Sequence, residues 1–124
     1  RLYRFENGLI GQISKDNTEG EKLLSMGLMT PDQIDEYPER KAIYSYIGRD
    51  VELIPDVYEI KKVKKGTMLF LCSDGVSDVL SQEEMATILK DSGSTAEKGT
   101  KMVEKALEEN QGFGDNITLI IIEY

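Results

Sequence analysis

The sequence predicts one α+β domain, or a part of one, and three observations favour this fold class. The chain has 124 residues, a length that suits a single domain. Apolar runs of strand length alternate with segments whose apolar residues recur at helical spacing. The sequence also contains no internal repeat and no low-complexity stretch that would indicate a linker between domains.

The first predicted elements are a β-hairpin and two short helices. Asn7-Gly8 separates two apolar runs, and this dipeptide favours a type I′ turn because both central positions of that turn need a positive φ. Thr18 and Thr30 are each followed three residues later by Glu or Gln, which is typical of a capping box at the start of a helix. We expect the second helix to end before Pro38.

The middle of the chain is predicted to be extended. Residues 42–47 read as a strand, and residues 51–60 read as a broken strand in which Pro55 marks an edge or a bend. Residues 67–73 include five consecutive apolar residues, so we expect a strand with both faces covered.

Two more helices and a last strand complete the predicted order. Ser81 and Ser94 each precede a Glu by three residues, so each is expected to cap a helix. Residues 111–116 are predicted to be a loop, and residues 117–124 a strand.

Composition excludes several classes of function. Fifteen Lys and Arg against 23 Asp and Glu give a net charge of −8, which argues against nucleic acid as the partner. The absence of His excludes imidazole zinc sites and Ser-His-Asp triads. The single Cys, Cys72, excludes an internal disulfide and reads as an inert thiol in an apolar strand. No segment approaches the ~18 consecutive apolar residues of a membrane helix.

Two aspartates lie at the ends of predicted strands and are the candidate functional carboxylates. Asp74, followed by Gly75, ends the most apolar strand, and Asp115 stands just before the last strand. Each also fits a plain turn, and Asp78 has the same alternative of bonding only to nearby backbone N–H groups. If neighbouring strands bring Asp74 and Asp115 together, they suit a shared Mg²⁺ or Mn²⁺ ion, since these ions prefer carboxylates and water.

Several motifs together resemble one family. Residues 69–80, LFLCSDGVSDVL, resemble the LLCSDGLTDVL segment of metal-dependent serine/threonine protein phosphatases, the PPM or protein phosphatase 2C family. Residues 114–120, GDNITLI, are similar to its closing DNIT motif. Earlier in the chain, residues 16–17, 23–31 and 37–40, with Gly48, resemble the DHS…LVEAGxITPEE…HPxRN…LG pattern of the bacterial branch. Arg1-Leu2-Tyr3 resembles the continuation of the family's GDSR strand.

The resemblance implies a site for metal ions. It places Asp74 and Asp115 among the ligands of a binuclear Mn²⁺ or Mg²⁺ centre, with Asp78 contributing to a possible third, weaker ion. Gly75 would be the glycine of close approach, and Asn116 would orient the Asp115 loop. No side chain is the implied nucleophile, because a water activated by the metal attacks the phosphorus.

The resemblance also implies a flap that meets the phosphorylated substrate, over residues 16–41. Asp16, Asn17 and Arg40 are its candidate substrate residues. Two positions depart from the family's pattern, because Asn17 and Tyr37 stand where His is usual. These departures concern substrate handling and not the metal ligands.

The implied fold is the PPM β-sandwich, two antiparallel sheets flanked by helices, of which residues 1–124 supply the C-terminal portion. Since the chain starts at Arg1 and matches half of the family's length, we expect it to come from a longer protein. Alone it is expected to be inactive and to expose sheet surface that favours self-association. The implied activity is hydrolysis of phosphoserine or phosphothreonine in proteins, with a serine/threonine kinase as a possible partner and the cytoplasm as the location.

Two alternatives remain open at this stage. The chain would be a non-catalytic, phosphatase-like module that binds a kinase or scaffold if it takes up no metal. An aspartyl-phosphate phosphohydrolase also places Asp-Gly after an apolar strand, but it needs Asp-x-Asp, and Cys72 stands where its nucleophile belongs.

Overall fold

The computed structural model describes residues 1–48, 52–111 and 114–124. It divides into two compact units, one of Arg1–Ser14 with Tyr58–Tyr124 and the other of Lys15–Val57. Two predictions fall partly outside the described residues: the start of the strand at residue 51 and the centre of the loop at residues 112–113. Each unit is described by itself.

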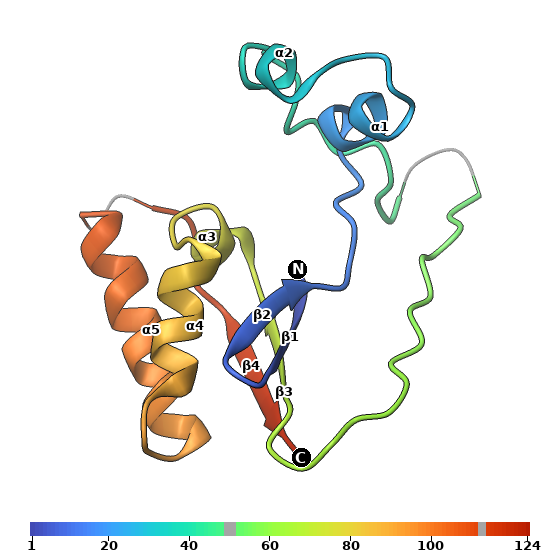
Figure 1. The fold of residues 1–124 in the computed structure, drawn as a ribbon. Coiled ribbons are helices and arrows are strands. Elements are labelled where there is room, and N and C mark those ends of the chain that lie inside the picture. The colour runs from blue at the N-terminus through green and yellow to red at the C-terminus, as the bar shows by residue number, and fades with distance from the viewer. Residues whose placement is uncertain (49–51, 112–113) are drawn as a thin grey trace. The chain divides into compact units, whose positions relative to one another are not determined.

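A four-stranded antiparallel sheet forms the first unit (Figure 1). Its strands are β1 (Leu2–Glu6), β2 (Leu9–Gln12), β3 (Met68–Cys72) and β4 (Leu119–Glu123), in the order β2-β1-β3-β4. The predicted hairpin is confirmed, because Asn7 and Gly8 both have a positive φ and join β1 to β2. The order places β3 between the first strand of the chain and the last one.

Three helices pack on one face of this sheet (Figure 1). They are α3 (Asp74–Ser77), α4 (Gln82–Lys90) and α5 (Thr95–Glu109). The capping boxes predicted at Ser81 and Ser94 are confirmed, since in each the serine hydroxyl accepts a backbone N–H and the glutamate accepts the serine N–H. The helix α3 replaces a predicted turn after β3.

Alternation along the strands determines which side chains enter the core. Tyr3, Phe5, Phe70 and Cys72 face the helices and are buried. The helices contribute six residues to the same core, and Met68 and Leu80 complete it. The six are Val76, Met85, Ala86, Leu89, Met102 and Ala106. The core therefore lies between the sheet and its helices.

The opposite face of the sheet is apolar and open. Leu71, Ile120 and Ile122 point to this side and are 37%, 56% and 44% exposed. The register pairs Leu71 with Ile120, and it pairs Ile122 with Leu69, which is buried. We call the exposed patch of Leu71, Ile120 and Ile122 the open face. The prediction that both faces of the β3 strand are covered is therefore wrong at Leu71.

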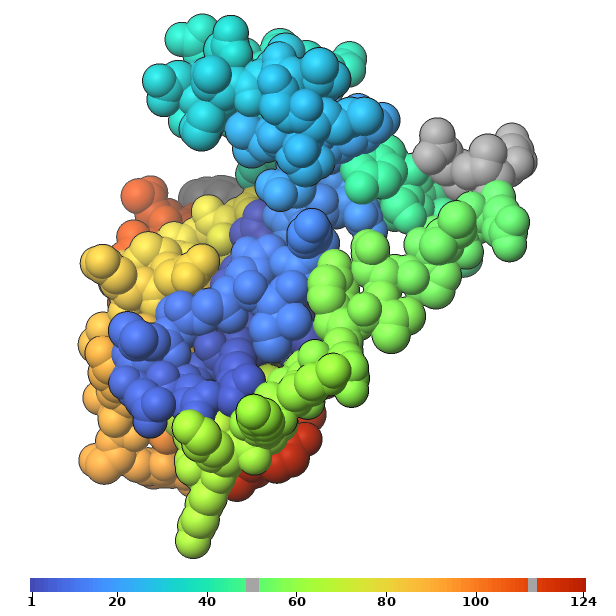
Figure 2. All heavy atoms as spheres, turned by 45° about the vertical axis from the view of Figure 1, so that its right-hand side comes forward, coloured from blue at the N-terminus to red at the C-terminus, as the bar shows by residue number. Residues whose placement is uncertain are grey.

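A charged strap crosses part of the sheet beside β1. The Arg4 guanidinium donates to the Lys61 carbonyl at 3.4 Å and to the Lys62 carbonyl at 3.1 Å. Figure 2 shows the light-green segment that contains these lysines beside the blue hairpin. Glu6 pairs with Arg4 at 2.5 Å and with Lys64 at 3.5 Å. The Glu6–Lys64 ion pair and the two Arg4 hydrogen bonds therefore hold the basic segment at the sheet.

The second unit holds two short helices, α1 (Glu19–Ser25) and α2 (Pro31–Asp35). The capping box of α2 is confirmed, with Thr30 and Gln33 bonding reciprocally. At α1 the Thr18 hydroxyl accepts the Glu21 N–H at 3.3 Å. A Cβ at Gly20 would lie 2.8 Å from the Arg40 carbonyl oxygen, so this glycine lets residues 40–42 run against α1.

The predicted strands over residues 42–47 and 51–60 are wrong in the part of the chain that is described. Only an isolated antiparallel bridge joins Thr18 to Ile43. Ile47, Ile54 and Val57 are 90%, 79% and 89% exposed, so these apolar residues have no sheet to pack on within the described chain. In the described parts of the chain, no helix has the length and apolar character to cross a membrane.

Candidate metal centre

The end of β3 is tied to the segment that leads into β4 through Ser73. The Ser73 N–H donates to the Thr118 carbonyl at 2.9 Å. The Ser73 hydroxyl donates to the Asn116 carbonyl at 2.9 Å and accepts the Thr118 N–H at 3.0 Å. Although Ser73 is the N-cap residue of α3, its side chain makes no capping bond. Its hydroxyl therefore joins the residues next to Asp74 and Asp115.

Gly75 allows the two segments to approach closely. A Cβ added at Gly75 would lie 2.5 Å from the Asn116 carbonyl oxygen and 3.1 Å from that of Asp115. A real Cβ atom does not tolerate such a distance to a backbone atom, so the approach requires glycine. Gly75 is buried, while Asp74 and Asp115 on either side of the contact are exposed.

The carboxylates of Asp74 and Asp115 are each held by one local hydrogen bond. The Gly75 N–H donates to Asp74 Oδ1 at 3.0 Å, and the Asn116 N–H donates to Asp115 Oδ1 at 2.6 Å. A carboxylate has several lone pairs, so each of these side chains keeps acceptor capacity for a ligand. The structure thus brings together the segments that carry the two predicted metal ligands.

Asp78 lies one helical turn beyond Asp74 and is engaged by an arginine. Its N–H donates to the Asp74 carbonyl at 2.8 Å, at the end of α3. Its Oδ1 atom lies 3.2 Å from Nη1 of Arg1. The same Arg1 nitrogen donates to the Ser77 carbonyl at 2.8 Å. Asp78 is therefore an ion-pair partner as well as a predicted metal contributor.

The donor chemistry fits a hard divalent ion, but the described residues supply only part of a ligand set. Carboxylate oxygens suit Mg²⁺ and Mn²⁺. Residues 1–48, 52–111 and 114–124 contain no group of three or more His, Cys, Asp or Glu side chains that could hold a metal ion. Within these residues, the predicted ligands therefore do not form a complete metal-binding cluster.

Asp16, Asn17 and Arg40 belong to the second unit. The Asn17 side chain makes two hydrogen bonds there: its Nδ2 donates to the Asp56 carboxylate at 2.8 Å, and its Oδ1 accepts from the Tyr44 hydroxyl at 3.0 Å. The Arg40 guanidinium donates to the Tyr37 carbonyl at 3.3 Å. The side chains of Asn17 and Arg40 therefore make contacts that stabilise their own unit.

Cys72 is unsuited to be a nucleophile. Its side chain is buried in β3, and burial raises the pKa of the Cys72 thiol above its ordinary value. A raised pKa keeps the thiol protonated near neutral pH, and the thiolate is the reactive form. This agrees with the sequence-based interpretation of an inert thiol.

Two residues at the site were not assigned a role from the sequence. In the sequence, Arg1 stands out only as the arginine of the GDSR-like strand, and Ser73 only as the serine of the Ser-Asp-Gly segment. A serine between a buried strand and Asp-Gly does offer a signal, because its hydroxyl can bond to the neighbouring strand. The Arg1–Asp78 pair had no local signal, since the two residues are far apart in the sequence.

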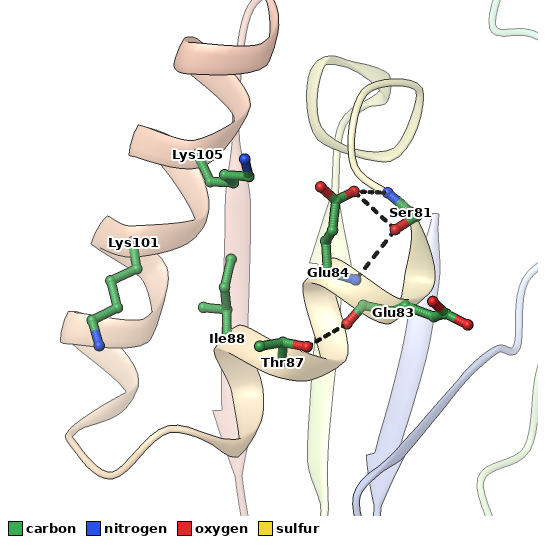
Figure 3. Close-up of a pocket in the computed structure, with 7 residues that line it drawn as sticks. All are labelled: Ser81, Glu83, Glu84, Thr87, Ile88, Lys101 and Lys105. Atoms are coloured by element: carbon green, nitrogen blue, oxygen red, sulfur yellow. Dashed lines mark hydrogen bonds between the residues drawn. The ribbon is translucent and has the colours of Figure 1, made fainter.

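A groove of about 490 Å³ lies between α4 and α5, and none of Asp74, Asp78 and Asp115 lines it (Figure 3). Its lining consists of Ser81, Glu83, Glu84, Thr87, Ile88, Lys101 and Lys105. None of these was a candidate from the sequence. Glu84 in this groove points back to Ser81 as part of the capping box, and Lys105 pairs with Glu109 at 2.5 Å.

Known proteins similar to this chain are phosphatases. The chain is 31% identical to the serine/threonine protein phosphatase PstP of Mycobacterium tuberculosis over 124 residues, which cover 99% of this chain and 23% of PstP. It is 28% identical to the serine/threonine phosphatase Stp of Listeria welshimeri, covering 99% of this chain and 48% of Stp. The chain thus spans about half or less of the length of these relatives. No protein-family model matches the sequence.

Solved structures show the same fold. The crystal structure of the M. tuberculosis phosphatase PstP/Ppp matches with a TM-score of 0.80 and 30% identity, over 100% of this chain and 52% of that one. A structure of the PstP catalytic domain in complex with two manganese ions matches with a TM-score of 0.72 and 29% identity, over 99% and 49%. The sheet with its flanking helices is thus part of the fold of a protein serine/threonine phosphatase. Over almost its whole length, this chain is similar to one part of these serine/threonine protein phosphatases.

Proposed function

We propose that this chain is the C-terminal portion of a catalytic domain that hydrolyses phosphoserine and phosphothreonine in proteins with the help of divalent metal ions. The observation that carries the proposal is the contact at Gly75, where the backbone of residues 115–116 meets the start of α3. This contact places the segments of Asp74 and Asp115 side by side. The similarity to phosphatases over almost the whole chain supports the same assignment.

In this proposal, Asp74 and Asp115 are ligands of Mn²⁺ or Mg²⁺. The PstP structure with two manganese ions, at 29% identity, supports a binuclear centre. Divalent ions at such a site supply Lewis acidity and neutralise phosphoryl charge. The chain's own residues bind and orient: Gly75 permits the close approach, and Ser73 and Asn116 hold the Asp115 segment against β3.

The remaining ligands are proposed to come from residues outside this chain. The described residues hold no complete cluster of metal ligands, and the relatives are about twice as long as the match or longer. The open face offers a surface for the rest of the domain, since a β-sandwich packs two sheets through apolar faces. We therefore expect residues 1–124 alone to be inactive.

Substrate contact is proposed for the flap over residues 16–41, with Asp16, Asn17 and Arg40 as candidate contacts. Residues 15–57 form a compact unit of their own, which supports a separate role for this segment. Phosphorylated proteins are the proposed substrates, with a serine/threonine kinase as a further partner. The cytoplasmic location belongs to the same proposal, and it rests on the single cysteine and on the family.

The test uses the complete encoded protein, with whatever residues flank this chain. Hydrolysis of p-nitrophenyl phosphate and of a phosphothreonine peptide is measured with Mn²⁺, with Mg²⁺ and with a chelator. We expect activity that requires the metal and that falls by about 100-fold or more in Asp74→Asn, since electrostatic groups at a reacting centre contribute that much.

Asp91→Asn is the matched control. It makes the same change at an exposed carboxylate at the end of α4, which pairs with Lys101 at 2.7 Å. It is expected to keep full activity. Undiminished turnover in Asp74→Asn would refute the site assignment. A complete protein without metal uptake or turnover would instead indicate a non-catalytic interaction module.

A further inference from the structure

Arg1 contacts both β3 and the end of α3. Its backbone pairs with Cys72 of β3, through bonds of 2.8 Å from the Arg1 amino group to the Cys72 carbonyl and 3.0 Å from the Cys72 N–H to the Arg1 carbonyl. Its guanidinium reaches the last turn of α3, at the Ser77 carbonyl and the Asp78 carboxylate. A fixed positive charge therefore stands at the end of the helix that begins with Asp74.

Asp74 and Asp78 share one face of α3. They are four positions apart, which places their Cβ atoms about 5–6 Å from each other on a helix. An ion held by Asp74 is therefore within reach of the Asp78 carboxylate. The Asp78 Oδ1 atom, however, already lies 3.2 Å from Arg1 Nη1, and the two side chains are 29% and 27% exposed.

We propose that the Arg1 guanidinium is an internal counter-cation that competes with a divalent ion for the Asp78 carboxylate and so keeps one ion of the site weakly bound. An ion that takes Asp78 as a ligand either displaces Arg1 from Oδ1 or binds beside its positive charge, and both weaken the binding of the ion. Arg remains protonated at any pH at which the protein is folded, so pH does not relieve this competition. The inference rests on the proposed function, because it assumes that Asp74 binds a metal.

The competition predicts a specific order of metal affinities. Mn²⁺ binding is measured on the complete encoded protein by electron paramagnetic resonance, which counts free Mn²⁺ and resolves tight sites from weak ones. Because partly exposed ion pairs are worth about 0.2–1 kcal/mol, Arg1→Gln is expected to tighten the weakest Mn²⁺ site about two- to fivefold. Arg1→Lys keeps the charge, and its weakest site is expected to stay within about twofold of the wild type.

Three further variants separate competition from a general effect on the fold. Lys101→Gln also removes one positive charge, and it breaks the 2.7 Å ion pair between Lys101 of α5 and Asp91 at the end of α4. Because neither residue is a proposed ligand, this variant is expected to leave Mn²⁺ binding unchanged. Asp78→Asn is expected to weaken the weakest site, and the double variant Arg1→Gln with Asp78→Asn is expected to lose the gain. Circular dichroism melts check that each variant is folded.

The outcomes distinguish this inference from the function on which it rests. If Asp74→Asn leaves all Mn²⁺ sites unchanged, the proposed metal centre is wrong and the inference falls with it. If Asp74→Asn weakens binding but Arg1→Gln leaves the weakest site unchanged or loosens it, the inference alone is overturned. Should Arg1→Gln fail to fold, unchanged Mn²⁺ binding in Asp78→Asn overturns it equally.

Discussion

Gly75 is the residue at which one added carbon tests the candidate site. A methyl group there would stand 2.5 Å from the Asn116 carbonyl oxygen, which is backbone and cannot swing aside. Gly75→Ala must therefore move the Asp115 segment away from α3, and we expect a loss of stability of about 1–3 kcal/mol, as in other overpacked sites. Thermal unfolding and metal-dependent turnover of the complete protein measure the two effects.

Gly11→Ala is the matched control for this change. Gly11 lies in β2, and a Cβ built on it meets nothing within 4 Å. We expect its stability and turnover to stay near those of the wild type. A Gly75→Ala protein that melts and turns over like Gly11→Ala would show that the close approach does not hold the site together.

At the scale of the element, the helices α1, α2, α4 and α5 start where local sequence signals place them, whereas α3 has no such signal. A capping box needs only two residues that are three positions apart, so it can be found without knowledge of the fold. The strands over residues 42–47 and 51–60 were predicted from composition alone and are wrong, because a strand also needs a partner. The described residues around Ile47 and Ile54 provide none, and Pro55 removes a backbone donor directly after Ile54.

The capping boxes of α4 and α5 also predict a pH dependence of stability. The Ser81 N–H donates to the Glu84 carboxylate and holds its pKa below the ordinary value of 4.5, and the Ser94 N–H does the same for Glu97. A carboxyl group with a lowered pKa in the folded state adds stability that is fully present above pH 4.5. That stability is lost as the pH falls through the lowered pKa.

Glu84→Gln with Glu97→Gln tests this dependence without removing the boxes. Gln33 already fills the same place in the capping box of α2, so the chain itself shows that glutamine fits. Urea unfolding between pH 3 and pH 7 is expected to show a shallower loss of stability on acidification in the double variant than in the wild type. Parallel curves for the two proteins would mean that these carboxylates do not contribute.

At the scale of the whole molecule, local motifs identify candidate site residues but not which of their segments meet. Asp74 and Asp115 stand out because each lies beside an apolar strand and next to a glycine. That their segments meet depends on β3 and β4 being neighbours, which is a property of the sheet order and not of either motif. The Arg1–Asp78 pair is non-local in the same way, so only the structure reveals that a counter-charge stands beside a predicted ligand.

The open face gives the last prediction. Ile120 and Ile122 lie on β4, at an edge of the described sheet, and large exposed apolar patches of this kind drive association. We expect residues 1–124, made alone, to associate reversibly as the concentration rises. Replacing both isoleucines by serine should weaken that association by roughly tenfold or more, since each buried isoleucine contributes about 1.5–3 kcal/mol.

Sedimentation velocity over a range of concentrations measures this association. Leu107→Ser is the control, because Leu107 is 50% exposed on α5, away from the open face of the sheet. It is expected to associate as the wild type does. A chain that stays monomeric at every concentration, or one whose association depends on Leu107 and not on the two isoleucines, would show that the open face is not the surface that a second sheet covers. The proposal that the rest of the domain packs there would then lose its physical basis.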